Sequence, residues 1–421
     1  MTSIADLARI PRPSERRIAL HVTAAAERAV RQGHPWLFES SIRQQKRDGE
    51  PGDLAVIFDH QDRFLAVGLY DPFSTIRVRV LQYGEPAPIG SDWFRDKLAA
   101  AIQRRAGLAS ADTDGYRLVH GANDHFPGLV IDRYAQTLVL KLYSIAWIPH
   151  LPDVLAALAA VQPHQRAVLR LGRAPQDDPR HLYGLEDGVL LSGPSPDEAQ
   201  TPGLRVTFRE NGLRFEVDPI HGQKTGFFLD QRENRARVEA RSAGKRVLDV
   251  FAYTGGFSVY AARGGARVVV SLDASQPALS AAERNFDLNR DHPAVAVTHH
   301  ETSAGDAFEV LAQMGREGRQ FDLIVIDPPS FAQQAAHVDA AIAAYEKLTH
   351  LGLDLLRRGG VLVQASCSSR VSADAFFAAV HRAANRANRA LCEEMHTGHP
   401  IDHPVKFKEA AYLKCLFAIA P

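Results

Sequence analysis

Cysteine is scarce in this chain of 421 residues, which has only Cys367, Cys392 and Cys415. The three stand apart, without the C-x-x-C spacing of a zinc ribbon, and they are too few for a disulfide framework. We therefore predict no metal site. Any cysteine with a chemical role is expected to act as a thiol.

Long apolar runs are also absent. No stretch approaches the roughly 18 apolar residues that span a bilayer, and the N-terminus lacks the apolar core of a signal peptide. A length of 421 residues predicts about two to four domains. These features argue against a membrane protein and indicate a globular protein of the cytoplasm.

Net charge is absent as well, because 49 Lys and Arg balance 49 Asp and Glu. The whole chain therefore gives no electrostatic sign of nucleic-acid binding. The distribution is uneven, since residues 1–47 contain nine Lys or Arg against four acids, with Arg16-Arg17 and Lys46-Arg47 as clusters. This excess suits contacts with phosphate groups, and it equally suits a solvated terminal face.

The segment Val247 to Ala262, VLDVFAYTGGFSVYAA, carries the most informative pattern. A buried apolar strand leads through Asp249 to a turn with Gly255 and Gly256, and a helix follows. Adjacent glycines let the backbone approach a ligand, and the helix start offers unpaired N–H groups. The third glycine of a G-x-G-x-x-G dinucleotide motif is missing, so the turn suits a nucleoside cofactor without phosphates.

Polar residues stand where four further predicted strands end. Asp273 ends RVVVSLDAS, Asp306 follows a weaker strand, Asp327 ends FDLIVIDPPSF before two prolines, and Cys367 ends GGVLVQASCSS. In an open parallel sheet, ligands bind beyond the carboxyl ends of the strands. These residues are therefore predicted to line one crevice.

This order of motifs resembles the class I S-adenosylmethionine-dependent methyltransferases. With HPWLF near the start and GQKTGFFLDQRENR before the first strand of the sheet, the chain is similar to bacterial large-subunit ribosomal RNA cytosine-5 methyltransferases of the RlmI type. The resemblance covers nearly the whole chain. D-x-F-x-x-x-G-G alone is moderately specific, but its combination with FFLDQR, DPPSF and SCS in this order is strong.

The resemblance implies an α/β fold, with a class I methyltransferase Rossmann-like sheet preceded by a small PUA β-barrel and a mixed α/β middle domain. We place the PUA-like RNA-binding barrel at residues 16–88, the middle domain at 89–196 and the methyltransferase domain at 204–421. A hairpin, LRVTFRENGLRFEVDP, is predicted to open the last domain, after an exposed linker, SGPSPDEAQTPG. YLKCLFAIA is expected to return as an antiparallel strand at the end.

The implied cofactor is S-adenosyl-L-methionine. By matching motif, Asp273 would hold the ribose hydroxyls, Asp306 the adenine amino group, and Asp249 with Gly255 the methionine end. The other cofactor-binding residues that we predict are Phe227, Phe251, Tyr253, Gly256 and Asp327. Each acid taken alone also fits a turn or a helix cap.

Two more segments are assigned by the same reasoning. Gln231, Arg232 and Asn234 would bind the carboxylate of the cofactor or order the loop. His396, His399 and His403 have helical spacing, but the nearby Gly398, Pro400 and Pro404 disfavour a helix. We therefore expect these histidines in a substrate-side loop rather than at a metal.

Cytosine C5 is too poor a nucleophile to take a methyl group from a sulfonium directly, so the ring must first be activated. A thiolate added at C6 makes C5 enamine-like, which allows methyl transfer, loss of the C5 proton and elimination of the thiolate. Cys367 is the predicted nucleophile, flanked by Ser366 and Ser368, which can hydrogen-bond a thiolate. A small buried hydrophobe is the alternative, but Ser-Cys-Ser is unlike a buried strand centre.

Asp327 is the predicted catalytic companion, because a carboxyl held by Pro328 and Pro329 can keep a proton against cytosine N3. A strand-terminating turn is the alternative. Cys367 is followed by Ser368-Ser369-Arg370, where the resemblance leads us to expect histidines. The base that removes the C5 proton is therefore unidentified.

The predicted reaction is methyl transfer from S-adenosylmethionine to C5 of a cytosine in large-subunit (23S) ribosomal RNA through a covalent cysteine adduct. Two alternatives stay open. One is methylation of a guanine nitrogen that uses Asp327, and the other is a noncatalytic RNA-binding factor. The predicted partner is large-subunit ribosomal RNA, with no membrane, and a homodimer is left open.

Overall fold

The computed structural model describes residues 5–109, 112–194, 204–332 and 334–421, so most of the predicted linker lies outside the described residues. Contacts within the chain divide it into two compact units. The first unit contains Met1–Arg209, Val217–Phe227 and Ile401–Phe407. The second contains Glu210–Glu216, Phe228–Pro400 and Lys408–Pro421.

Six short strands form the N-terminal sheet of the first unit, in the order β2-β6-β5-β4-β1-β3. They are β1 (Ile18–Val22), β2 (Trp36–Phe38), β3 (Ile42–Gln45), β4 (Leu54–Phe58), β5 (Phe64–Tyr70) and β6 (Ile76–Tyr83). Alternate residues of β1 are buried, which turns one face of that strand toward a small apolar core. Helix α1 (Ala24–Arg31) begins at Thr23, whose hydroxyl caps the first turn.

A five-stranded sheet follows in the same unit, in the order β11-β10-β9-β8-β7. Its strands are β7 (Gly115–His120), β8 (Leu129–Tyr134), β9 (Thr137–Leu142), β10 (Arg166–Leu171) and β11 (Leu190–Ser192), accompanied by α2 (Ser91–Arg104), α3 (Leu151–Val161) and α4 (Arg173–Gln176). Leu69 and Leu81 of the N-terminal sheet share an apolar core with Phe94 and Trp147 of this part. Because of this shared core, the predicted barrel (16–88) and the predicted middle domain (89–196) fall into one compact unit.

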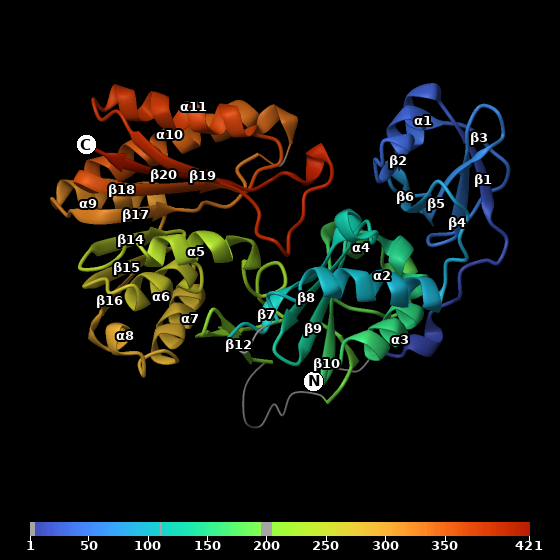
Figure 1. Cartoon of the computed structure of the whole chain (residues 1–421), viewed down its shortest axis with the longest axis horizontal. Coiled ribbons are helices and arrows are strands. Elements are labelled where there is room, and N and C mark those ends of the chain that lie inside the picture. Colours follow the sequence, from blue (N-terminus) through green and yellow to red (C-terminus); the bar gives the residue numbers. More distant parts are fainter. Residues whose placement is uncertain (1–4, 110–111, 195–203, 333) are drawn as a thin grey trace. The chain divides into compact units, whose positions relative to one another are not determined.

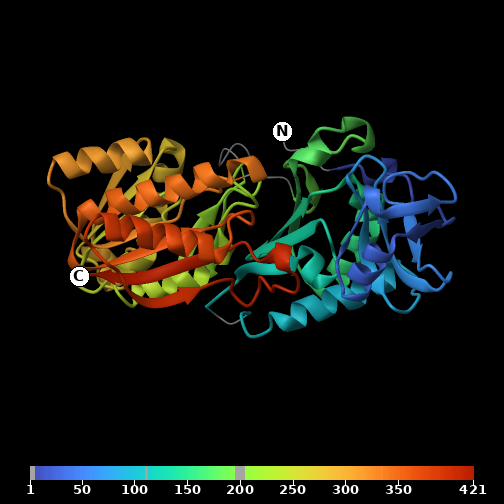
Figure 2. The ribbon, with the colours of Figure 1, turned by 90° about the horizontal axis from the view of Figure 1, so that it is seen from above.

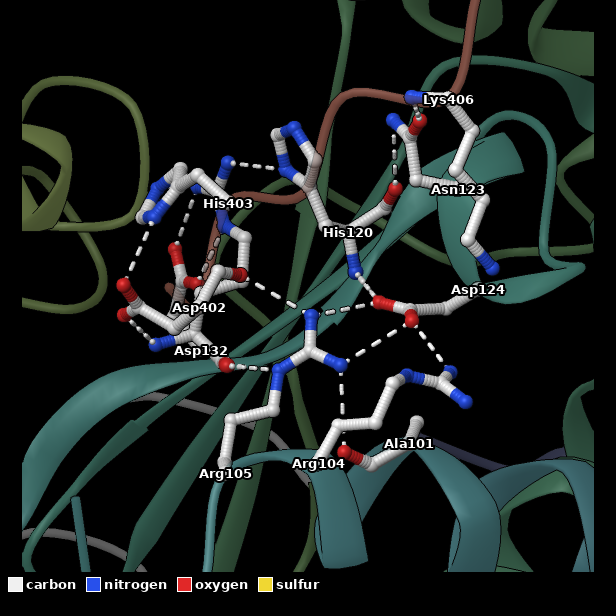
Figure 3. A network of polar contacts seen from close by, with 11 residues as sticks. Ala101, Arg104, Arg105, His120, Asn123, Asp124, Asp132, Asp402, His403 and Lys406 are labelled. Atoms are coloured by element: carbon white, nitrogen blue, oxygen red, sulfur yellow. Dashed lines mark hydrogen bonds and ion pairs between the residues drawn. The ribbon is translucent and has the colours of Figure 1, made fainter. Parts of the chain in front are cut away.

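A buried ion-pair network ties the segment Ile401–Phe407 into the first unit (Figure 3). The Asp124 carboxylate accepts from both terminal nitrogens of Arg105, at 3.0 and 2.6 Å, and from the backbone N–H of His120 at 2.7 Å. Arg105 also donates to the Asp402 carbonyl at 2.9 Å, and the Asp402 carboxylate accepts from the Arg117 N–H at 3.0 Å. A segment from the end of the chain is therefore held among residues of the middle region.

The predicted hairpin is present as β12 (Val206–Glu210) and β13 (Leu213–Val217). Its turn is Asn211-Gly212, both with positive φ, at 49° and 83°. Asn-Gly is the preferred pair for such a two-residue turn, because both positions need left-handed backbone. The chain passes between the two units within this hairpin.

A seven-stranded sheet forms the centre of the second unit, in the order β16-β15-β14-β17-β18-β20-β19. The strands are β14 (Arg246–Val250), β15 (Val268–Asp273), β16 (His299–Ala304), β17 (Phe321–Ile326), β18 (Leu356–Ser366), β19 (Cys392–Thr397) and β20 (Lys414–Ala420). The first five run parallel, and β20 returns antiparallel beside β18. The returning strand confirms the expectation from the sequence.

Helices cover both faces of this sheet (Figure 1). One face carries α5 (Arg232–Glu239), α6 (Gly256–Arg263) and α7 (Gln276–Asp287), followed by the short α8 (Pro293–Val297). The other carries α9 (Ala307–Arg316), α10 (Val338–Leu355) and α11 (Ala373–Arg386), with α10 and α11 side by side in orange in Figure 2. No helix in the described part of the chain is both long and apolar enough to cross a bilayer.

Candidate active site

The carboxyl ends of β14 to β18 meet at one edge of the seven-stranded sheet, because these strands are parallel. Asp273 ends β15, Asp327 follows β17 and Cys367 follows β18. Strand β20 runs the other way, so its first residue, Lys414, lies at the same edge, paired with Ser366. Ligands bind at this edge in open α/β sheets.

The loop after β14 is shaped by left-handed backbone at Phe251, Tyr253 and Gly255, with φ of 66°, 49° and 76°. The Tyr253 N–H donates to Asp273 Oδ2 at 2.8 Å, which fixes the loop to the end of β15. A Cβ atom on Gly255 would lie 2.8 Å from Cβ of Ala282 in α7. Glycine is therefore required here by close packing against a helix, a reason that differs from the expected approach of a ligand. Gly256 is buried as the first residue of α6.

Asp249 lies inside the sheet, one residue before the end of β14. Its Oδ2 accepts from the Ser258 hydroxyl at 2.6 Å, and that hydroxyl also contacts Ser271 Oγ at 2.7 Å. Burial raises the pKa of the Asp249 carboxyl to about 7, while the Ser258 hydrogen bond opposes the shift. A proton or a nearby positive charge is needed to stabilise this group at neutral pH.

Two buried polar atoms flank this loop without a hydrogen-bond partner among the described residues, namely Asp249 Oδ1 and Thr254 Oγ1. Buried polar atoms are normally paired in folded proteins. An unpartnered carboxylate oxygen and an unpartnered hydroxyl are both able to accept a hydrogen bond from the ammonium group of a methionine moiety. The residues present therefore fit the cofactor end that the sequence assigned to Asp249.

Asp273 and Asp306 are both engaged by backbone groups. Asp273 Oδ1 accepts from the Ser275 N–H at 2.9 Å, in addition to the Tyr253 bond on Oδ2. Asp306 is exposed and is the N-cap of α9, where Oδ1 accepts from the N–H groups of Phe308 and Glu309 at 2.9 and 3.2 Å. The cap uses one carboxylate oxygen only.

Cys367 is half-buried directly beyond β18. Its Sγ lies 3.8 Å from the carbonyl oxygen of Pro328, the residue after Asp327. Residues 327 and 367 are 40 positions apart in the sequence, and the pairing of β17 with β18 brings them together. The structure thus places the two predicted catalytic residues at adjoining loops.

The hydroxyls beside the cysteine are engaged elsewhere. Ser366 Oγ contacts the Tyr345 hydroxyl at 2.8 Å and accepts from the Ser368 N–H at 3.3 Å. Ser368 Oγ donates to the Ala332 carbonyl at 3.4 Å. These serines therefore hold the turn around Cys367, whereas the sequence suggested that they would bind a thiolate.

Phe227 belongs to the first unit, whereas the other predicted cofactor-binding residues belong to the second. It is buried there, with its ring 5.2 Å from that of Phe208 and its N–H bonded to the Tyr134 hydroxyl at 3.2 Å. The next residue, Phe228, belongs to the second unit and packs edge-on against Tyr253 at 5.2 Å. Phe228 is therefore the aromatic residue of this motif that contacts the loop after β14.

The LDQRENR part of the motif makes internal contacts within the second unit. Asn234 donates to Gln231 Oε1 at 2.6 Å and accepts from the Thr397 hydroxyl at 2.6 Å. Arg232 is buried at the first position of α5. These contacts agree with the loop-ordering role that the sequence allowed for Gln231 and Asn234.

The three histidines near the C-terminus lie in different places. His396 stacks on Phe377 with ring centres 3.8 Å apart, and His399 accepts from the Leu413 N–H at 3.1 Å. His403 belongs to the first unit and is 1% exposed. His396 lies in β19 rather than in a loop, and His403 belongs to another unit, because a local pattern does not reveal which strand or unit a segment joins. That these histidines face the substrate stays a prediction.

Lys414 is a residue that the sequence reasoning did not single out. It is 6% exposed and starts β20 beside the turn that carries Cys367. A lysine inside the apolar run YLKCLFAIA is the signal that could have marked it, because lysine is seldom fully buried. Its neighbour Cys415 is buried in the strand, as expected, and burial raises the pKa of that thiol.

Two family models match the chain. One is described as an S-adenosylmethionine-dependent methyltransferase and matches residues 199–417. The other is described as a PUA-like domain and matches residues 20–83, nearly the whole N-terminal sheet. Both matches confirm the expected combination of a PUA-like part and a methyltransferase part.

Known proteins are similar over almost the entire length. A ribosomal RNA large subunit methyltransferase of Deinococcus radiodurans is 50% identical over 412 residues, which is 97% of this chain and 98% of the relative. A ribosomal RNA large subunit methyltransferase I of Pseudoalteromonas translucida is 34% identical over 403 residues, 94% of this chain and 98% of the relative. Among solved structures, a proposed SAM-dependent methyltransferase from Streptococcus mutans has 22% identity and a TM-score of 0.79, with 96% of this chain and 100% of that chain covered. A proposed methyltransferase complexed with SAH has 22% identity and a TM-score of 0.80 at the same coverage, so both share the fold.

Proposed function

Because this chain belongs to the S-adenosylmethionine-dependent methyltransferase family, we propose that it methylates C5 of a cytosine in large-subunit ribosomal RNA through a covalent adduct with Cys367. The observation that carries the proposal is the position of Cys367. Its half-buried thiol lies 3.8 Å from the Pro328 carbonyl, beside Asp327, at the carboxyl edge of the sheet. A cysteine that served only as a core residue would not need to lie half-buried at the carboxyl edge of the sheet.

Ribosomal RNA as substrate is supported by two independent features. The relatives that align with 97% and 94% of this chain carry the name of a large-subunit ribosomal RNA methyltransferase. The N-terminal sheet matches a PUA-like domain, and Arg16, Arg17, Arg43 and Lys46 are exposed around it. Exposed cations on a separate sheet suit contacts with phosphate groups, which position RNA without reading its sequence.

Several residues of the sheet edge would hold the cofactor. Asp249 and Thr254 would accept its methionine end, Asp273 its ribose, and the second carboxylate oxygen of Asp306 its adenine amino group. When bound, S-adenosylmethionine supplies an electrophilic methyl group on a sulfonium. The raised pKa of Asp249 matches this role, because a cationic methionine end favours the ionised carboxylate.

The residues of the chain carry the remaining chemistry. The Cys367 thiolate donates an electron pair to C6, while Asp327 holds a proton against N3 and so stabilises the charge that moves into the ring. C5 then uses the displaced π electrons to take the methyl group. The C5 proton then passes to a base, and the electron pair of the broken C5–H bond restores the C5–C6 double bond. The C6–S bond breaks with its electrons on sulfur, which releases the thiolate.

The test is a trapping experiment with RNA that contains 5-fluorocytidine. Fluorine at C5 cannot leave as a proton, so the adduct persists after methyl transfer and is seen as a protein–RNA band in a denaturing gel. The full chain and Cys392→Ala, which changes an exposed thiol, are expected to form the band. Cys367→Ala is expected to form none.

Other results would favour the alternatives. Methyl incorporation into guanine, unchanged in Cys367→Ala and lost in Asp327→Ala, would show a guanine-N methyltransferase. RNA binding without incorporation of a labelled methyl group would show a noncatalytic factor. Either result contradicts the cytosine proposal.

A further inference from the structure

Lys414 is a buried cation whose hydrogens are all directed at backbone carbonyls. Its Nζ donates to the carbonyl oxygens of Ser368, Val371 at 2.6 Å and Tyr412 at 3.1 Å. An ammonium group has three hydrogens, so these bonds use its full donor capacity. The side chain therefore ties the turn after Cys367 to the start of β20.

Its burial is unusual because no carboxylate of the described residues lies within ion-pair distance of its Nζ. Burying a charge is unfavourable unless an opposite charge or good hydrogen bonds compensate. Burial lowers the pKa of Lys414 to about 8, and the nearby Cys367 thiol works against that shift. Perturbed groups of this kind collect at functional sites more often than elsewhere.

The position of Lys414 relative to Cys367 follows from the strand pairing. Lys414 is opposite Ser366 in the β18–β20 ladder, and its Nζ bonds the carbonyl of Ser368, so it is bonded on both sides of residue 367. Tyr345 is another titratable group that interacts with this thiol, and Asp327 precedes the proline whose carbonyl the thiol contacts. Burial raises the pKa of Tyr345 to about 12, which leaves it neutral at pH 7, so Lys414 is the positive group of the set.

We propose that Lys414 is a positioning residue for the reactive cysteine, with a positive charge at neutral pH that favours the thiolate form of Cys367 and bonds that hold its turn. The proposal rests on the covalent role of Cys367 given above. A positive charge beside a thiol stabilises the thiolate, which is the nucleophilic form. A protonated ammonium group has no lone pair, so Lys414 cannot accept the C5 proton while it is charged, and its role is distinct from that of the base at C5.

The experiment measures the thiolate of Cys367 directly, in the full chain without RNA or cofactor. The rate of alkylation by iodoacetamide is followed from pH 5 to pH 10, and the peptide with Cys367 is quantified by mass spectrometry, which separates it from the exposed Cys392. For the unchanged chain, the midpoint is expected below the ordinary thiol value of about 8.5. A midpoint at or above that value overturns the proposal without any variant.

Three variants separate charge from structure. Lys414→Gln keeps an N–H donor without the charge and is expected to raise the midpoint by about one unit or more, an approximately tenfold lower rate at pH 7. Lys414→Arg keeps the charge and is expected to restore most of the shift. The control Lys347→Gln, an exposed lysine of α10, is expected to leave the midpoint unchanged.

An unchanged midpoint in Lys414→Gln, or an equal shift in Lys347→Gln, would contradict the inference. The assay is independent of methyl transfer. A low midpoint that depends on Lys414, together with no 5-fluorocytidine adduct, would therefore refute the proposed function while leaving the electrostatic role of Lys414 in place.

Discussion

Asp249 shows how a single buried carboxyl links stability to pH. Its pKa of about 7 lies above the ordinary value of 3.8, so the folded chain binds this proton more tightly than the unfolded chain does. The stabilisation from the bound proton is complete below pH 4 and is lost as the pH rises through about 7. Over this window, the group should lower the free energy of unfolding by at most ~1.4 kcal/mol per pH unit.

Asp249→Asn is expected to remove this contribution, so the pH slope of the free energy of unfolding should be flatter in the variant. Denaturant unfolding at several pH values between 4 and 7 measures the slope. Asp374→Asn, at an exposed carboxyl of α11, is the control and should keep the slope of the unchanged chain. Parallel curves for Asp249→Asn and the unchanged chain would show that the pKa of Asp249 is the same in the folded and unfolded chain, which contradicts the prediction.

At the residue scale, the sequence indicated which residues carry reactive groups better than it indicated which side chains they contact. Asp327 and Cys367 could be chosen because acids and thiols at strand ends are visible in the sequence. Lys414 could not be chosen, since only the pairing of β18 with β20 places it opposite Ser366. The hydroxyl of Ser366 likewise has its partner, Tyr345, on a helix that no local pattern connects to it.

At the scale of elements, the strand-to-helix turn after β14 depends on Gly255. Gly255→Ala would place a Cβ atom 2.8 Å from Cβ of Ala282 and would force alanine into left-handed backbone. Left-handed alanine costs roughly 1–2 kcal/mol and overpacking another 1–3 kcal/mol, so we expect a loss of about 2–5 kcal/mol. Thermal or denaturant unfolding measures it.

Gly244→Ala is the matched control for this prediction. Gly244 also has positive φ, at 69°, but a Cβ atom there would meet nothing within 4 Å. Only the backbone cost of about 1–2 kcal/mol is expected. Equal losses at the two glycines would show that packing against α7 contributes nothing.

Four of the predicted parallel strands, β14, β15, β17 and β18, and the returning strand have apolar runs long enough to specify a sheet. Strand β16 has no such run and joins the sheet by pairing with β15. The packing of Gly255 against α7 could not be predicted, since the sequence cannot show how close that helix passes. Asp306 illustrates a similar limit. It caps α9, and an aspartate in the sequence looks the same whether it caps a helix or binds the amino group of a ligand.

At the scale of the whole molecule, the buried network around Asp124 connects distant parts of the sequence (Figure 3). Burial raises the pKa of its carboxyl, but the guanidinium of Arg105 outweighs this and holds the pKa below its ordinary value. Asp124→Asn would leave the buried Arg105 without its ionised partner, so we expect a loss of about 3–5 kcal/mol in the free energy of unfolding.

Asp92→Asn is the control, since Asp92 forms an exposed ion pair with Arg95 at 2.9 Å and should matter little. Denaturant unfolding of both variants at pH 7 makes the comparison. A loss at Asp124 no greater than that at Asp92 would show that the network does not hold the first unit together.

The assignment of chain segments to the two units was the hardest feature to predict from the sequence. Most of the segment HTGHPIDHPVKF forms the predicted loop, although His396 and Thr397 end β19. The partners of Asp402 are Arg105 and Arg117, nearly 300 positions earlier. Such long-range pairing leaves no local periodicity. The domain bounds expected at 16–88, 89–196 and 204–421 remain a proposal, to which the two contact-based units add a different division.

The chain crosses between its two units at five places, and the segment with Asp402 leaves the second unit and returns to it. No single cut in the gene can therefore yield both units intact. A graft of the seven-stranded sheet onto another protein would carry Ile401–Phe407 away from Arg105 and Arg117 unless that loop were rebuilt. A single recombination event would divide at least one of the units for the same reason, so the two units are expected to be inherited together.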